Sequence, residues 1–211
     1  MVDLKSMSKK KQAEYIWDYY KLHIIGGFAI IFIVVSIINS HFTKIDYVFN
    51  LTMIGNVIDE NKKGDLEKQL TSMVVKKGEM RKQAIIDITP IDSSKSSDAT
   101  MKNEYMQRFI AKMSVGELDV VILDKDMFKS FVKQNIFLRL DNISGLNLNS
   151  IKKEKIKAEG KDNNNVVYAI NAEDIKIFKD MGFNTHNKVI GIISSCKQVD
   201  KATLVLRWLL K

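Results

Sequence analysis

The sequence predicts an α/β protein: an N-terminal transmembrane helix, then one α/β lobe with a mostly parallel sheet and helices on both faces. Two observations support this prediction. An apolar segment without Lys, Arg, Asp or Glu runs from Leu22 to Thr43. After it, short and nearly continuous apolar runs alternate with segments of helical periodicity. Such runs are typical of strands that helices bury on both faces.

The apolar segment is long enough to cross a bilayer. As a helix, its 22 residues rise about 33 Å, and a hydrocarbon core is about 30 Å thick. Its strongly polar side chains lie at the two ends, so no ion pathway is indicated; these are His23, Asn39, Ser40 and His41. A cleaved signal peptide and a buried core helix are the alternatives. A signal peptide has a shorter apolar core and a small-residue cleavage site, and residues 36–42 (SIINSHF) match such a site poorly.

The charges that flank this segment predict its orientation. Lys9, Lys10, Lys11 and Lys21 precede it, whereas Lys44, the first basic residue after it, is followed closely by an aspartate. Basic residues stay on the cytoplasmic side. We therefore predict a single-pass protein of the cell membrane that contacts the lipid bilayer. Its parts are a cytoplasmic amphipathic N-terminus (1–21), a transmembrane helix (22–43) and an extracytoplasmic α/β domain (44–211).

The domain begins with a predicted strand, helix and strand. Residues 47–54 (YVFNLTMI) form an apolar run typical of a buried strand. Residues 65–75 have apolar side chains at helical spacing, and residues 83–89 (QAIIDIT) form a second strand. Pro90, the only proline, ends that strand because it cannot donate a ladder hydrogen bond.

The remaining elements follow the same alternation. Helices are predicted where apolar residues recur every three or four positions, and strands where they are nearly continuous. The residues between 141 and 165 are polar and rich in Asn and Lys, which indicates a surface excursion. The predicted elements are a helix over 101–113, a strand over 118–123, a helix over 127–133, a strand over 166–170, a helix over 172–181, a strand over 189–194 and a closing helix through 211.

Composition excludes several classes of protein. The chain of 211 residues has a net charge of +8, but its lysines are spread evenly and no stacking platform appears, so no nucleic-acid partner is predicted. One cysteine, Cys196, rules out a disulfide within the chain, and its apolar surroundings predict a small core residue. Zinc spacing and glycine-rich phosphate loops are missing, so neither a metal nor a cofactor is predicted.

One part of the chain resembles a known family. The run from Gly116 to Asp124 (GELDVVILD), followed by Met127, Phe128, Phe131, Asn135–Phe137 and Leu140–Asp141, resembles the extracellular solute-binding proteins of ABC importers. Residues 167–170 resemble that family's return segment, and residues 197–210 its closing helix.

This resemblance implies a periplasmic-binding-protein-like lobe. The family has two lobes, whereas only about 25 residues here separate Asp141 from Val166, where the second lobe would be inserted. The chain therefore resembles a single lobe. Its Tyr- and Trp-containing N-terminal lead and its Lys-over-Arg bias also resemble small membrane-anchored proteins of low-GC Gram-positive bacteria.

Polar residues follow three of the predicted strands. In open α/β sheets, ligands lie beyond the carboxyl ends of the strands, and amides, hydroxyls and carboxylates there suit a polar ligand. Helix capping and turn formation are the alternative roles for such residues. The candidate ligand-binding residues are Asn56, Thr89, Asp92, Ser93, Asp124 and Asp126.

No catalytic residue is predicted. His186 is the only histidine after the apolar segment, and it lies in a polar turn without a nucleophile elbow nearby in sequence. The sequence therefore predicts a non-enzymatic, membrane-tethered accessory or binding domain that engages an envelope protein, such as an integral-membrane transporter. A tethered receptor for a small polar solute is the alternative, and an envelope hydrolase is a less favoured one.

Overall fold

The computed structural model describes residues 8–91, 99–160 and 165–211. The chain divides into two compact units, Met1–Ile45 and Asp46–Lys211. The first unit contains helix α1 (Lys9–Thr43), and the second contains all the strands and the other helices.

Helix α1 has the properties of a membrane span. Its stretch Trp17–Asn39 is the one segment of the described residues long and apolar enough to cross a membrane, and none of it is buried. At the start of this stretch the rings of Tyr15 and Tyr19 stack at 5.8 Å between centroids, and Tyr20 contacts both Tyr19 and His23. Tyrosine is enriched where a span meets the headgroup region. The helix therefore has an aromatic collar at the N-terminal end of its apolar stretch.

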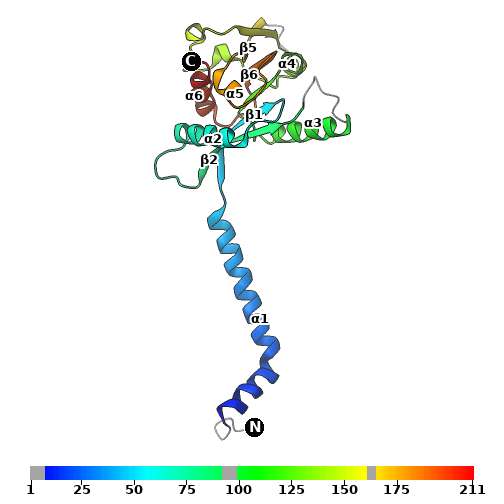
Figure 1. The fold of residues 1–211 in the computed structure, drawn as a ribbon, viewed down its shortest axis with the longest axis vertical. Helices are drawn as coiled ribbons and strands as arrows, with labels where there is room; N and C mark the ends of the chain where they lie inside the picture. The colour runs from blue at the N-terminus through cyan, green and yellow to red at the C-terminus, as the bar shows by residue number, and fades with distance from the viewer. Residues whose placement is uncertain (1–7, 92–98, 161–164) are drawn as a thin grey trace. The chain divides into compact units, whose positions relative to one another are not determined.

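The second unit contains one six-stranded sheet with the strand order β2-β1-β3-β6-β5-β4. Figure 1 labels β1, β2, β5 and β6 in this sheet. Strand β1 pairs in parallel with β2 and with β3, whereas β6 is antiparallel to β3 and to β5, and β4 is antiparallel to β5. The strands are β1 (Asp46–Ile54), β2 (Lys82–Thr89), β3 (Val120–Asp124), β4 (Lys155–Glu159), β5 (Asn165–Asn171) and β6 (Lys188–Ile192).

The sheet is therefore mixed, and the predicted parallel arrangement holds only for its N-terminal half. Strands β1, β2 and β3 are joined by helices, and such crossovers allow parallel neighbours. The connection between β4 and β5 has only five residues, too few for a crossover, so these strands form an antiparallel hairpin. Strand β4 lies within the predicted surface excursion. Its Ile156 and Ala158 alternate with charged residues, and only these two pack against the core.

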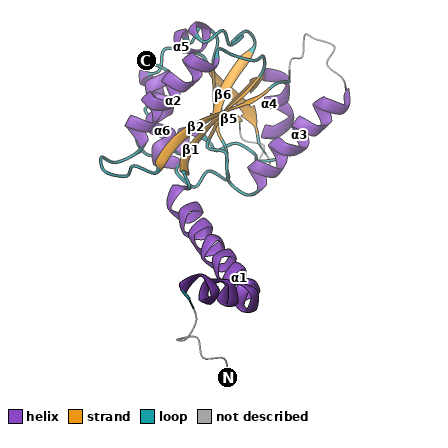
Figure 2. Ribbon diagram, turned by 60° about the horizontal axis from the view of Figure 1, so that its bottom comes forward, coloured by secondary structure: helices purple, strands orange, loops and turns teal. Residues whose placement is uncertain are grey.

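Helices cover both faces of the sheet, as predicted (Figure 2). Alternate residues of β3 belong to different cores: Val120 and Ile122 pack with α2, α5 and α6, whereas Val121 and Leu123 pack with α3 and α4. Period-two alternation sends successive side chains to opposite faces, so each face of this strand needs its own apolar cover. The helices are α2 (Glu60–Val74), α3 (Ala99–Ser114), α4 (Lys125–Val132), α5 (Lys176–Asp180) and α6 (Val199–Leu209).

One edge of the sheet is covered by side chains of α2. Strand β2 is an edge strand, and two of its backbone N–H groups bond to side chains of α2 rather than to β1. The N–H of Ala84 donates to Oγ1 of Thr71 at 2.9 Å, and the N–H of Ile86 donates to Oε1 of Glu67 at 2.8 Å. Unpaired donors at a sheet edge attract other strands. Helix α2 therefore supplies a polar cover as well as an apolar face.

Candidate functional site

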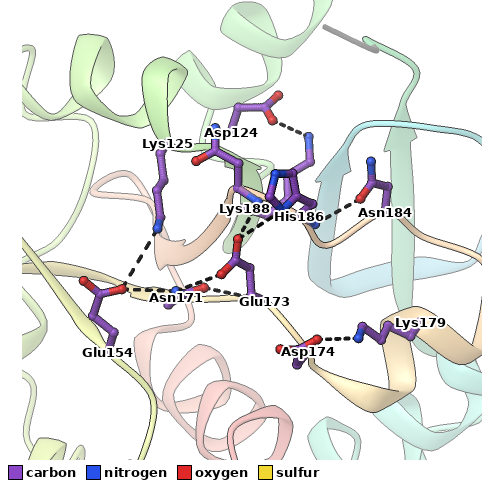
Figure 3. A network of polar contacts seen from close by, with 11 residues as sticks. Asp124, Lys125, Glu154, Asn171, Glu173, Asp174, Lys179, Asn184, His186 and Lys188 are labelled. Carbon is purple, nitrogen blue, oxygen red and sulfur yellow. Dashed lines mark hydrogen bonds and ion pairs between the residues drawn. The ribbon is translucent and has the colours of Figure 1, made fainter. Parts of the chain in front are cut away.

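Two of the predicted ligand-binding residues, Asn56 and Asp124, lie at the carboxyl ends of β1 and β3. There, residues 54–56 and Asp124 contact residues 182–188, the segment that leads into β6. We call these residues the strand-end cluster; Figure 3 shows part of it. Parallel strands place their carboxyl ends at one edge of a sheet, and the start of the antiparallel β6 lies at the same edge because Lys188 pairs with Asp124 in the ladder.

A buried lysine occupies the centre of this cluster. Nζ of Lys188 lies 2.9 Å from Oδ1 of Asp124 and donates to the carbonyl oxygen of Ile54 at 2.9 Å. The two charged side chains are only 6% and 14% exposed, respectively. A buried ammonium is costly unless charges and hydrogen bonds compensate it. Asp124 sits at the N-cap position of α4, but its side chain makes no capping bond, so it serves the ion pair instead.

Gly55 and Phe183 close the cluster on one side. The Nζ of Lys188 lies 5.9 Å from the centroid of the Phe183 ring, within cation–π range. A Cβ atom on Gly55 would lie 2.8 Å from Cε2 of Phe183. The ring can pack here only because residue 55 has no side chain. The space above Lys188 is thus filled by an aromatic ring rather than left open.

Asn56 holds the turn that carries Phe183. Its Nδ2 donates to the carbonyl oxygens of Gly182 at 2.7 Å and Val57 at 2.9 Å, and its Oδ1 accepts from the N–H of Asn184 at 2.7 Å. Both ends of the amide are therefore engaged within the chain. The predicted ligand-binding amide acts here as a clamp between β1 and the segment before β6.

Glu173 contacts several polar groups next to Lys188 and Asp124 (Figure 3). Its Oε1 accepts from the N–H of Asn187 at 2.8 Å and lies 3.5 Å from Nδ1 of His186. Its Oε2 lies 3.4 Å from Nδ2 of Asn171. These hydrogen bonds, chiefly the one from Asn187, lower the pKa of Glu173. Asn187 needs such support because its φ of 56° is in the left-handed region. The His186 side chain is 87% exposed.

Thr89 lies in a different place, a cleft under α3. This α3 cleft has a volume of about 360 Å³ and lies between β1, β2 and the helix. Thr52 and Thr89 are its buried hydroxyl residues. At its mouth the ammonium of Lys112 contacts the carboxylate of Asp87. The hydroxyl of Thr52 already donates to Oδ1 of Asn50 at 2.9 Å. The cleft therefore offers the hydroxyl of Thr89, both signs of charge and the ring of Tyr105 to a small molecule.

The remaining predicted residues are not drawn into the strand-end cluster. Asp126 is exposed in the first turn of α4 and pairs with Lys129 at 3.2 Å. Asp92 and Ser93 lie outside the described residues. Lys188 was not among the predicted site residues. A single charged residue at the start of an otherwise apolar, buried strand could have identified it.

Cys196 and Asp119 form a second buried polar pair. The thiol donates to Oδ1 of Asp119 at 3.0 Å, and the N–H of Asn50 donates to Oδ2 at 2.8 Å. Burial raises the pKa of Asp119. Burial, followed by the hydrogen bond to this carboxylate, raises the pKa of Cys196 to about 12. A thiol with so high a pKa is a poor nucleophile. Across the described ranges, no group of three or more His, Cys, Asp and Glu residues could hold a metal ion.

The fold and this cluster define a mixed α/β domain in a chain that also carries a helix suited to span a membrane. No protein-family model matches the sequence. Among curated proteins, the chain is similar to ATP synthase subunit b of Mycoplasma capricolum subsp. capricolum, with 28% identity over 116 residues. The match covers 53% of this chain and 64% of that subunit, which is less than two thirds of the relative's length.

Among solved structures, the chain is similar to an extracellular solute-binding protein of family 1 from Alicyclobacillus acidocaldarius. The TM-score is 0.35 and the identity 13%, over 61% of this chain and 28% of that one. A TM-score of this size marks a distant resemblance and does not establish a common fold.

Proposed function

We propose that this protein is a membrane-tethered, non-enzymatic accessory domain that engages another envelope protein, such as an integral-membrane transporter. One observation carries the proposal. The edge of the sheet where an α/β protein would hold a small ligand is occupied by the protein's own Lys188, Phe183 and Asn56. Lys188 is paired with Asp124 and the carbonyl of Ile54, and Asn56 is hydrogen-bonded to backbone groups, so these polar groups are already engaged within the chain. This edge is therefore better suited to support a protein contact than to enclose a solute.

Helix α1 supplies the tether in this proposal. The lysines before Trp17 favour a cytoplasmic N-terminus, and the domain from residue 44 onward then lies outside the cytoplasm. The similarity to a subunit of ATP synthase supports a role within a membrane-associated assembly, because that relative is named as one subunit of a larger enzyme. The distant similarity to a solute-binding protein suggests no particular partner.

The proposal is tested by cross-linking in native membranes. The full-length protein, tagged at its C-terminus, is cross-linked, solubilised in mild detergent and purified, and the accompanying proteins are quantified by mass spectrometry. We expect one envelope protein at near-stoichiometric amounts. A chain in which residues 17–39 are replaced by an unrelated transmembrane helix is the control for capture through the span alone. Recovery of the protein by itself, with efficient cross-linking of a known complex in the same membranes, would overturn the proposal.

A tethered receptor for a small polar solute is the second candidate, favoured by the α3 cleft. There Thr89, one of the predicted ligand-binding residues, lines an open space of about 360 Å³. Of the other predicted ligand-binding residues, Asn56 and Asp124 use their polar atoms inside the strand-end cluster, and Asp126 forms an ion pair with Lys129. A ligand of the cleft would raise the unfolding temperature of the full chain in detergent as its concentration rises. The Thr89→Val variant should lose that increase; a flat response to sugars, amino acids and peptides would exclude this candidate.

A further inference from the structure

A second pocket lies beside the C-terminal helix and differs in chemistry from the strand-end cluster. This groove, here called the α5–α6 groove, has a volume of about 530 Å³. It is bounded by residues 152–153, by residues 174–177 at the start of α5, and by residues 208–211 at the end of α6. Labels in Figure 1 locate α5, α6 and the C-terminus.

The rim of the groove is strongly basic. Four lysines but only one aspartate line it, and that aspartate, Asp174, already pairs with Lys179. Lys153 donates to the backbone carbonyl of Glu173. Within the described residues, Lys152, Lys176 and Lys211 are exposed and make no ion pair or hydrogen bond. Three ammonium groups are thus free to meet an anionic partner.

The floor of the groove is apolar. Ile177 and Trp208 are half-buried and pack against the core of the α2, α5 and α6 face. Leu209 and Leu210, which also line the groove, are buried and belong to the core against which Trp208 packs. Interfaces of this kind gain most of their affinity from an apolar group in a central pocket, while rim charges contribute chiefly rate and specificity.

From this combination we propose that the α5–α6 groove binds an acidic peptide segment that carries an apolar residue at its centre. Carboxylates on the segment face Lys152 and Lys176, and the apolar side chain rests on Trp208. A free inorganic anion would make no use of the apolar floor, and a flat membrane surface would not enter a concave groove. The inference rests on the proposed function, since it assigns the chemistry of the partner segment.

Trp208 provides the readout. The chain has two tryptophans, so the full-length Trp17→Phe variant in non-ionic detergent reports on Trp208 alone. Titration with the peptide Glu-Glu-Leu-Leu-Glu-Glu should change its fluorescence saturably, and added salt should weaken the effect. The double variant Lys152→Glu with Lys176→Glu should bind about tenfold more weakly or worse, because like charges then face each other.

Matched controls make this result specific. Lys77 and Lys133 are exposed lysines outside the groove, and reversing both changes the net charge equally, so that double variant should bind as the parent does. Circular dichroism confirms that each variant is folded. A peptide with serine in place of leucine should bind several-fold more weakly. Equal binding of the serine peptide, or stronger binding of inorganic phosphate or phosphatidylglycerol vesicles, would overturn the inference.

The two proposals fail separately. If the charge-reversed groove variant still captures the wild-type partner from membranes, the accessory function stands and the groove is not the docking site. If the peptide binds as expected but membranes yield no partner, the groove chemistry stands and the accessory function is wrong. Loss of the captured partner in the groove variant, with retention in the Lys77/Lys133 control, supports both.

Discussion

Asp124 and Lys188 lie directly opposite each other in the antiparallel pair of β3 and β6, with 2.9 Å between carboxylate and ammonium. The pair therefore locks the register of these strands at the end where β1 also finishes. One lysine connects three strands, because its ammonium also reaches the carbonyl of Ile54 in β1.

Replacing one member of this pair should lower the free energy of unfolding more than replacing both. Lys188→Met leaves the carboxylate of Asp124 mostly buried and unpaired, and we expect a loss of about 2–4 kcal/mol in the free energy of unfolding. The double variant with Asp124→Leu should recover at least about half of that loss. Urea unfolding of the full chain in detergent, followed by tryptophan fluorescence, measures both values. Additive losses would show that the two groups are not coupled.

The Asn56 clamp predicts a local destabilisation. Asn56→Ala removes the two hydrogen bonds that hold residues 182–184 and the one to the carbonyl of Val57, and about 1–2 kcal/mol of stability should be lost. Asn56→Asp keeps the acceptor for Asn184 but loses the donor to Gly182, so it should also destabilise. Asn61, exposed on α2 with no side-chain hydrogen bond among the described residues, is the matched control, and Asn61→Ala should change stability by less than about 0.5 kcal/mol. Equal losses of stability in Asn56→Ala and Asn61→Ala would contradict the role of Asn56 as a clamp.

Cys196 should be unreactive in the folded protein. With a pKa of about 12, only about one thiol in 10,000 is ionised at pH 8, whereas an unfolded chain with a thiol pKa near 8.5 ionises about a quarter. Labelling by 5,5′-dithiobis(2-nitrobenzoate) at pH 8 should therefore be at least about 1,000-fold slower without guanidinium than with it. Rapid labelling under native conditions would show that the thiol is exposed or that its pKa is ordinary.

Asp119 should make stability depend on pH. Its pKa is raised by burial in the folded state, so the folded protein holds its proton more tightly than the unfolded chain. Stability from this group is full below the unfolded pKa of about 3.9 and is lost as pH rises through the folded value. The free energy of unfolding of Asp119→Asn minus that of wild type should therefore increase as the pH rises from 4 to 7. The gain is about 1.4 kcal/mol for each pH unit that separates the two pKa values.

Thermal unfolding at several pH values tests this expectation. Asp126→Asn serves as the control for the removal of an exposed carboxylate. A constant difference between Asp119→Asn and wild type from pH 4 to pH 7 would refute the raised pKa.

Periodicity predicted most of the fold because most elements bury an apolar face. Strand β1 was expected over residues 47–54 and spans Asp46–Ile54, and α3 was expected over residues 101–113 and spans Ala99–Ser114. Strand β4 was not predicted, because an edge strand with charged residues at alternate positions resembles a polar loop in sequence. The direction of β6 was also not predictable, since apolar content does not reveal the sense of a strand.

The candidate site was predictable only in part. The rule that polar residues gather at strand ends located Asn56 and Asp124 correctly at one edge. Their partners come from residues 182–188, more than 60 positions away in the chain. Long-range pairing of this kind depends on the strand order, which single-sequence reasoning does not supply. Lys188 could have been flagged as an unusual residue, but not as the partner of Asp124.

The cover that Thr71 and Glu67 provide for β2 matters for a protein confined to a surface. Tethered molecules meet far more often than free ones, and an open strand edge would let neighbouring copies join their sheets into a continuous ribbon. Because α2 already holds the outward N–H groups of Ala84 and Ile86, such ribbon growth is disfavoured at this edge. In the proposed tethered state, the domain can therefore be crowded on a membrane without joining its sheets at this edge.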